Sequence, residues 1–365
     1  MKYLISILLL FAFAFPSEKN FTATSHNNND TTTNIFIITI DGYRWQELFN
    51  GADSNIVANE KYTRDAENLN NMYGGISTIE RRRNLMPFMW SVIAKKGQLY
   101  GNRNYDNNVN ISNPYALSYP GYSEMFTGKI DLSVTNNHKN INNNKNIFEY
   151  LNSKDCYHGK VALFTSWDVF PFILNEKRSG IAINSGYENV PEENSYAQQT
   201  LNTVQSNIIK NKEHTRQDML TFIAAKEYLQ QRKPTIFYLG LGETDEYAHK
   251  GNYDMYLQKA NESDKIISEL WYFVQTTEGY KNNTTFIITT DHGRGKSHSS
   301  WISHGTFTRG SSQTWLALLG KNIPALGEVK TEGQIFQKQL AQTIATLLGE
   351  EFGEQKAIET GLAVK

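Results

Sequence analysis

Aspartate and histidine side chains recur in three short motifs whose chemistry is that of a metal site. The motifs are Asp41-Gly42, Asp291-His292-Gly293, and Asp245 with His249 four residues later. Carboxylate oxygens and neutral imidazole nitrogens are ligands that suit zinc, with manganese as the second choice. These residue types therefore predict a metal centre, provided that the fold brings the three motifs together.

Each motif lies at or just after the end of a run of β-branched and aromatic residues. The runs cover residues 34–40, 235–241 and 285–290. They are too short for helices and apolar on both faces, as expected for central strands of a helix-covered parallel sheet. The carboxyl ends of parallel strands meet at one edge of the sheet, where ligands bind in open α/β folds. The three acids are therefore expected to share one site.

Each of these residues also has an interpretation without chemistry. Aspartates that follow strands often cap helices or turns, which would explain Asp41 and Asp291. His249 could be a surface histidine, and His304 a loop residue before a glycine. The joint occurrence of acids at strand ends, one of them followed directly by histidine, favours metal ligation.

The remaining patterns predict one enlarged α/β domain. Strands are predicted at 98–100 and 160–165, and helices at 86–96, 214–231, 253–276 and 335–348. This alternation is typical of a parallel sheet with right-handed crossovers. The segment 245–249 is interpreted as a loop. The Asn- and Lys-rich stretch 136–146 is interpreted as an exposed excursion without a role in the chemistry.

Residues 1–16 have the pattern of a signal peptide. Lys2 precedes an apolar run over 4–15, which contains the small-x-small sequence Ala12-Phe13-Ala14. The run is too short to span a bilayer, so no stable membrane anchor is expected. Residues 17–33 are a predicted polar linker, and 34–365 the folded domain. The protein is thus expected to be exported to a periplasm or to the cell exterior.

Composition limits the partners. The formal net charge is -1 and no basic stripe is present, so a nucleic-acid duplex is not an expected partner. Cys156 is the only cysteine, which excludes an intramolecular disulfide, and it is expected to be a buried small apolar side chain. The oligomeric state is not predicted.

Four segments in this order resemble the alkaline phosphatase superfamily, nearest to its type I phosphodiesterase and nucleotide pyrophosphatase branch. They are Asp41-Gly42, the stretch from Leu117-Ser118-Tyr119-Pro120-Gly121 to Phe126-Thr127-Gly128, Asp245 with His249, and Asp291-His292-Gly293 with His304-Gly305. No single segment is specific, but their order and strand context are. The resemblance implies an alkaline-phosphatase-like three-layer sandwich with a central, mostly parallel sheet.

The resemblance also implies two divalent ions, zinc by preference. One would be held by Asp245, His249 and His304. The other would be held by Asp41, Ser118, Asp291 and His292. Two ions about 4 Å apart can clamp the attacking and leaving oxygens of a phosphoryl group.

Ser118 is the nucleophile that the resemblance implies, because a metal can activate its otherwise weak hydroxyl. Tyr122 to Thr127 is expected to begin a helix whose amides face the phosphate. In the diesterase branch an asparagine commonly lies three residues after the nucleophile and holds a phosphate oxygen, whereas this chain has Gly121. That contact is therefore assigned to main-chain amides or to a nearby cation. Arg44 is the first choice because it is expected at the rim of the site, ahead of Lys250, Arg294, Lys296 and His298.

The sequence thus predicts an exported two-metal phosphoric ester hydrolase, a phosphodiesterase or phosphatase, that acts on a small-molecule phosphate ester through a phosphoserine intermediate. Aromatic residues near the motif loops slightly favour diester or nucleotide substrates. They are Tyr43, Trp45, Tyr115, Tyr119, Trp167 and Phe170, and core packing is the other explanation for each.

Three alternatives remain: a phosphomonoesterase-only alkaline phosphatase, a sulfatase-like hydrolase and a non-catalytic binding protein. The sulfatase pattern Cys or Ser-x-Pro-x-Arg has Tyr122 in the arginine position here, which disfavours sulfate esters. A non-catalytic relative would lack metal ligands, and none of the seven proposed positions is missing.

Overall fold

The structure is a computed structural model that describes residues 33–190, 195–209 and 214–358. The predicted signal peptide 1–16 lies outside the described residues. So does the predicted linker 17–33, apart from Thr33.

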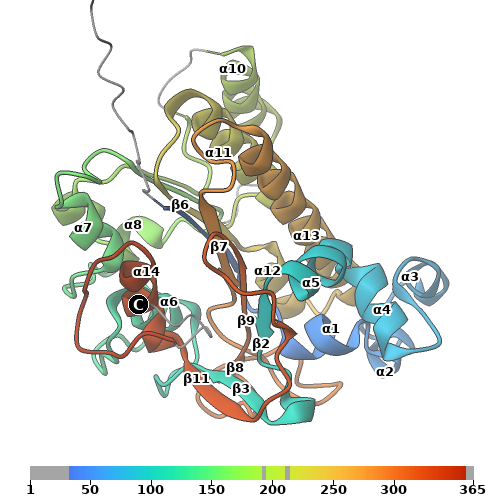
Figure 1. The fold of residues 1–365 in the computed structure, drawn as a ribbon. Helices are drawn as coiled ribbons and strands as arrows, with labels where there is room; N and C mark the ends of the chain where they lie inside the picture. Colours follow the sequence, from blue (N-terminus) through green and yellow to red (C-terminus); the bar gives the residue numbers. More distant parts are fainter. Residues whose placement is uncertain (1–32, 191–194, 210–213, 359–365) are drawn as a thin grey trace, which may run out of the picture. The chain divides into compact units, whose positions relative to one another are not determined.

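An eight-stranded sheet lies at the centre of the described chain (Figure 1). Its order is β10 (Gly327–Glu328), β2 (Gln98–Tyr100), β9 (Leu316–Gly320), β7 (Thr284–Thr289), β1 (Asn34–Ile40), β6 (Ile236–Leu241), β4 (Val161–Thr165) and β5 (Ile183–Ser185). Ile37 of β1 pairs in parallel with Tyr238 of β6 and with Ile287 of β7. Among the described strands of this sheet, β9 alone runs in the opposite direction. The ends of β1, β6 and β7 therefore meet at one edge, as predicted.

Helices cover both faces of the sheet. Phe36, Ile38 and Ile40 face a core with α1 (Trp45–Asn50), α4 (Thr78–Leu85), α11 (Asp218–Arg232) and α13 (Tyr253–Thr276). Ile35 and Ile37 face a second core with α6 (Ser118–Thr127), α7 (Ile147–Asn152), α8 (Phe170–Ile173) and α14 (Leu340–Leu347). Each large apolar side chain buried in these cores contributes about 1.5–3 kcal/mol. The predicted helix–sheet–helix architecture is confirmed.

Shorter elements surround these layers. A second sheet has the order β11 (Gly333–Phe336), β3 (Asn107–Asn110) and β8 (Gln313–Thr314). The short α-helices are α2 (Ser54–Val57), α3 (Ala66–Tyr73), α5 (Ala94–Lys96), α9 (Glu176–Ser179), α10 (Tyr196–Thr203) and α12 (Glu243–His249). Single turns of π-helix cover Met89–Ile93 and Val204–Ile208, and 3₁₀ turns cover Arg103–Tyr105 and Gln337–Gln339. Within the described ranges, no helix combines the length and apolar character needed to cross a membrane.

Several predicted boundaries were wrong where tertiary contacts decide the backbone. Ile335 was predicted to be helical but pairs with Val109 in the second sheet, so that α14 begins only at Leu340. Residues 214–217 were predicted to belong to α11. They remain outside it because Thr215 forms a β-bridge with Trp167. The predicted loop 245–249 is part of helix α12.

One prediction about exposure was wrong, because Cys156 is exposed rather than buried. The stretch 136–146 is exposed at residues 138–141, 143 and 145, as predicted. It is nevertheless anchored to the fold: Asn142 is buried and donates to Ser123 Oγ, and Asn146 is buried and caps α7. Its asparagines satisfy backbone and side-chain groups that would otherwise be buried without partners.

Candidate metal centre and nucleophile

Turns after β1 and β7 bring the first two acids together. Asp41 follows β1 directly, and the amide of Gly42 donates to Asp291 Oδ1 at 3.0 Å. Gly42 has a positive φ of 57°, and a Cβ at this position would lie 2.5 Å from Asp245 Oδ1. The glycine is therefore needed both for the turn and for the approach of the third acid.

The deep cluster consists of Asp41, Asp291 and His292. Their ligand atoms all lie within 4.8 Å of one another, and their side chains are 0–6 % exposed. His292 Nε2 lies 3.6 Å from Asp41 Oδ1 and 3.4 Å from Asp291 Oδ2. Ser118 Oγ is 3.1 Å from His292 Nε2 and 3.5 Å from Asp41 Oδ1. The predicted second ligand set is thus assembled in one place.

The outer cluster consists of Asp245, His249 and His304. One turn of α12 separates Asp245 from His249, and the distance from Asp245 Oδ2 to His249 Nε2 is 3.1 Å. His304 Nε2 lies 3.0 Å from His249 Nε2 and 3.8 Å from Asp245 Oδ1. The outer cluster adjoins the deep one through His292, whose ligand atom lies within 4.8 Å of those of Asp245 and His304.

Two of the imidazoles are held with Nε2 toward the acids. His292 Nδ1 lies 2.9 Å from the carbonyl of Gly293, and His304 Nδ1 lies 2.9 Å from the carbonyl of Ala116. A carbonyl can only accept, so each Nδ1 carries the proton. Burial lowers the pKa of His292 to about 4 and also lowers the pKa of His304. Both rings are therefore neutral with a free Nε2 lone pair, as metal binding requires.

The deep cluster has uncompensated negative charge. Burial, and then repulsion by Asp291 and Asp245, raises the pKa of Asp41. Burial raises the pKa of Asp291 to about 7. Asp291 Oδ2 is buried and has no hydrogen-bond partner among the described residues. A carboxylate oxygen with no donor, facing a neutral imidazole lone pair, fits a divalent cation, so the residues present suit the metal that the motifs predict.

The outer cluster differs because a cation already contacts it. Burial alone would raise the pKa of Asp245, but Arg294, followed by His249 and His304, outweighs burial and holds that pKa well below its usual range. Arg294 is buried and donates to Asp245 Oδ1.

Ser118 is the first residue of α6, so this helix begins four residues earlier than predicted. Gly121 lies in its first turn, where a Cβ would approach the carbonyl oxygen of Asp291 to 2.5 Å. Gly121 thus packs α6 against the turn after β7, and its amide donates to the carbonyl of Leu117 at 2.9 Å. A substrate contact at Gly121 stays a prediction. Tyr122, which the sequence analysis did not assign to the site, donates its hydroxyl to Asp41 Oδ2 at 3.0 Å.

Arg44 does not lie at the rim of the site. Its side chain is 1 % exposed, forms an ion pair with Glu47 and donates from Nη1 to the carbonyl of Gly295 at 2.9 Å. Sequence spacing gave its distance from Asp41 along the chain but not the direction of its side chain. The predicted rim position was wrong, and the guanidinium is instead a buried link between α1 and the loop after β7.

A cleft of 610 Å³ opens beside the deep cluster. It is lined by Asp41, Ser118, Asn137, His138, Lys139, Trp167, Asp168, Val169, His214, Thr215, Gly242, Asp245, Glu246 and His249. Three of these residues come from the stretch 136–146, for which the sequence predicted no role in the chemistry. Asn137 Oδ1 accepts from the amide of Tyr119, next to Ser118. Of the six aromatic residues considered, Trp167 is the one that lines this cleft.

Comparison with known proteins agrees with this geometry. Residues 134–309 match a family model described as the Metalloenzyme superfamily, a stretch with five of the seven proposed ligands but without Asp41 and Ser118. No curated protein sequence matches the chain.

Similar solved structures cover most of this chain. Wild-type alkaline phosphatase PafA has a TM-score of 0.57 at 11% identity, over 90% of this chain and 98% of that one. The fold is that of the alkaline phosphatase superfamily.

Other structures share this fold at similar distance. The lipoteichoic acid synthase LtaP from Listeria monocytogenes has a TM-score of 0.56 at 13% identity, over 90% of this chain and 76% of that one. A 2-O GAG sulfatase has a TM-score of 0.53 at 14% identity, over 89% and 72%. The alkaline phosphatase superfamily fold thus accommodates several ester chemistries, and membership of the type I phosphodiesterase branch stays a prediction.

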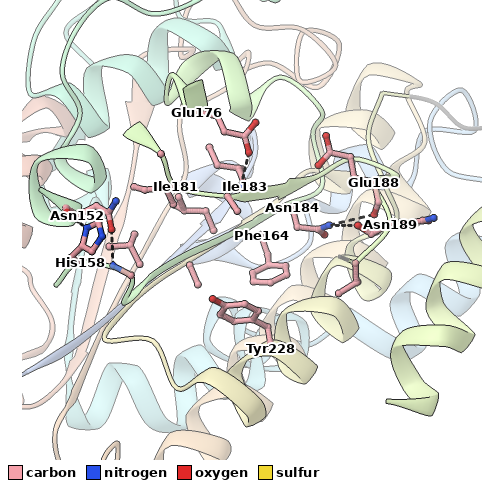
Figure 2. A pocket seen from close by; sticks show the side chains of 17 residues that line it. Asn152, His158, Phe164, Glu176, Ile181, Ile183, Asn184, Glu188, Asn189 and Tyr228 are labelled. Atoms are coloured by element: carbon pink, nitrogen blue, oxygen red, sulfur yellow. Dashed lines mark hydrogen bonds between the residues drawn. The ribbon is translucent and has the colours of Figure 1, made fainter. Parts of the chain in front are cut away.

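A separate cavity of 380 Å³ lies at the β5 edge of the sheet, and none of the seven proposed ligands lines it. Figure 2 shows the neighbouring rings of Phe164 and Tyr228 in this cavity, and Asn184 directed toward Glu188 and Asn189. Its lining combines apolar side chains of β4 and of residues 181–183 with the polar side chains of His158, Glu176 and Glu188.

Proposed function

We propose that this chain is an exported, metal-dependent phosphoric ester hydrolase in which Ser118 is the nucleophile. The observation that carries the proposal is the position of Ser118 Oγ, at the wall of the cleft and 3.1 Å from His292 Nε2. The resemblance of the sequence to the alkaline phosphatase superfamily implies the same residue.

The deep cluster and Ser118 would hold one zinc ion, and the outer cluster a second. When bound, such ions supply positive charge that stabilises the ionised hydroxyl and the phosphoryl oxygens. The orphaned Asp291 Oδ2 and the neutral His292 support this assignment.

The residues of the chain orient the reaction. Ser118 Oγ loses its proton to water and attacks phosphorus. The bond from phosphorus to the leaving-group oxygen breaks, and that oxygen departs with the electron pair and takes a proton from water. Water then hydrolyses the phosphoserine and restores the Ser118 hydroxyl. Ser118 lies at the positive end of the α6 dipole, which favours an anionic phosphoryl group. Tyr122 holds Asp41 through Oδ2, leaving Oδ1 directed to Ser118.

Asn137 replaces Arg44 as our candidate side chain for the phosphoryl contact. Its Oδ1 accepts from the Tyr119 amide, which fixes the side chain beside Ser118. Its Nδ2 has no partner in the described part of the chain. A second hydrogen-bond donor is available from Lys139 in the same cleft, whose Nζ contacts Asp168 Oδ2 at 2.8 Å.

The cleft favours an ester with a substantial second substituent. Its volume of 610 Å³ exceeds the needs of a phosphoryl group alone, and Trp167 offers an aromatic wall for a ring. We therefore retain the preference for diester or nucleotide substrates. Sulfate esters remain the second candidate because a sulfatase shares the fold.

Substitution of the nucleophile tests the proposal. Ser118→Ala is expected to lower turnover by at least about 10³-fold while zinc content stays within a factor of about two, because only one weak ligand is lost. Ser91→Ala, at an exposed serine of the π-turn Met89–Ile93, is the matched control. Hydrolysis of p-nitrophenyl phosphate and of its bis ester measures turnover, and faster hydrolysis of the monoester would reverse the diester preference. Retained turnover in Ser118→Ala would refute the nucleophile.

Export rests on the sequence pattern of residues 1–16 alone. Sequencing the amino terminus of the protein after expression in a secreting host is expected to find a start close to residue 17. An intact Met1 would contradict export.

A further inference from the structure

Arg294 is a buried cation that contacts the outer cluster. Its side chain is 0 % exposed and forms an ion pair with Asp245 through Nη1. Nε donates to the carbonyl of Trp301 at 2.8 Å, and Nη2 donates to the carbonyl of Ile302. With all three nitrogens bonded and no exposed surface, Arg294 does not hold a substrate phosphate, which was one of the roles considered from the sequence.

The carboxylates of the two clusters differ in their hydrogen-bond and ion-pair partners. Asp245 has Arg294 on Oδ1 and His249 on Oδ2. Asp291 has the Gly42 amide on Oδ1 and no partner for the buried Oδ2. The deep cluster therefore lacks a cation, whereas the outer cluster already contains one.

The deep cluster is also less exposed to solvent than the outer cluster. In the deep cluster the side chains of Asp291 and His292 are fully buried. In the outer cluster the side chain of His249 is 49 % exposed. Charges on the buried side are screened less by water, so an ion is held more strongly there.

Formal charge also distinguishes one bound ion from two. A metal ion binds aspartates in their ionised form and imidazoles in their neutral form. With Arg294, which pairs with Asp245, the ion-bound ligand set then carries two formal negative charges, and one divalent ion offsets them. A second divalent ion would make the centre positive unless an anion accompanies it.

We propose that Arg294 makes the two ion positions unequal. The deep position binds its ion tightly, and the outer position binds its ion weakly and mainly together with an anionic ligand. Arg294 is thus a positioning residue that acts on ion occupancy. By linkage, an anion that favours the second ion must itself bind more tightly when that ion is present. The inference builds on the metal centre proposed above.

Zinc titration of chelator-stripped protein tests this inference, with calorimetry for affinity and elemental analysis for the number of ions per chain. Wild type is expected to bind one zinc ion, then a second at least about tenfold more weakly. Arg294→Gln removes the charge but can still donate to carbonyls, and is expected to tighten the second ion by about tenfold or more. Arg294→Lys retains the positive charge, so its affinity for the second zinc ion is expected to stay as weak as in wild type. Arg82→Gln, at a partly buried arginine that pairs with Glu328, is the control for loss of a cation elsewhere.

Other results would overturn the inference. Two equal zinc affinities in wild type would do so, as would equal weakening of the second ion in Arg294→Gln and Arg294→Lys. Circular dichroism shows whether Arg294→Gln folds. If it does not, the zinc titration is repeated on wild type with inorganic phosphate, which is expected to raise the affinity for the second zinc ion. An unchanged affinity would refute the inference. Binding of no zinc at all would refute the proposed metal centre itself, a distinguishable result.

Discussion

At the scale of single residues, the predicted ligands depend on partners that the motifs do not contain. Ala116 and Gly293 fix the tautomers of His304 and His292 through their carbonyls. Tyr122 fixes Asp41. Such outer partners orient ligands and tune the ion as much as the ligands themselves do. The chemistry of the centre therefore extends beyond the seven residues found from the sequence.

Tyr122→Phe tests this dependence. The change removes the hydroxyl that donates to Asp41 Oδ2 but keeps the ring that packs against Phe170 and Phe126. Zinc affinity, measured by competition with a chromophoric chelator, is expected to fall about 10–100-fold. Tyr157→Phe is the control, because its hydroxyl bonds the carbonyl of Leu348, outside both clusters. Unchanged zinc affinity in Tyr122→Phe would show that Asp41 needs no such support.

The three aspartates and His292 were predictable because they lie close behind apolar strands. His249 was found by its spacing from Asp245, and Ser118 and His304 were found only through the resemblance of their motifs to those of the alkaline phosphatase superfamily. Arg44 and Asn137 had no such signal. The direction of the Arg44 side chain depends on Glu47, which neutralises it inside the core. Asn137 belongs to a stretch whose composition is typical of solvated loops, and only its bond to the Tyr119 amide places it beside Ser118.

At the scale of elements, the sheet edge accounts for the convergence of the site. Parallel pairing of β1 with β6 and β7 places the carboxyl ends of the three strands side by side. The acids that follow these strands therefore lie close together. Helix α12 adds the spacing of one turn between Asp245 and His249. Predicted strands and the long helix α13 were confirmed because their apolar patterns are long and consistent. The predicted ends of elements were wrong where pairing with another strand determines the backbone conformation, as at Ile335.

Helix α13 also carries a buried acid that links it to the π-turn Met89–Ile93. Asp264 accepts from the amides of Phe88 and Met89 at 2.6 and 2.8 Å. Burial raises the pKa of Asp264 from 3.8 to about 7. Between these values the folded protein binds more protons than the unfolded chain, so this group's contribution is complete below about pH 4 and is lost as pH rises through 7.

Asp264→Asn is therefore expected to flatten the pH dependence of stability. Relative to this variant, the free energy of unfolding of wild type should fall by on the order of a few kcal/mol between pH 4 and 7. Urea unfolding of both proteins in the presence of a chelator gives the comparison without metal loss. The variant also loses one amide acceptor, but that cost does not change with pH. Parallel profiles for the two proteins would contradict a raised pKa at Asp264.

At the scale of the whole molecule, the fold and the chemistry are separate conclusions. The alkaline phosphatase superfamily fold was predictable from four ordered motifs and is confirmed. A phosphatase, a sulfatase and a lipoteichoic acid synthase share it, so the fold alone does not select the ester. The proposed site of selection is the cleft, whose walls come from segments distant in sequence, such as 137–139 and 214–215. Contacts between such segments leave no local signal, which is why sequence analysis did not find them.

The central claim is that Ser118 becomes covalently phosphorylated during turnover. The most direct measurement is peptide mass spectrometry of zinc-loaded enzyme quenched with acid while it hydrolyses a bis(p-nitrophenyl) or mono(p-nitrophenyl) phosphate. The account predicts a phosphoryl or phosphodiester adduct on the peptide that contains Ser118, localised to that residue and absent from Ser118→Ala. Rapid turnover with an adduct on another residue would contradict it.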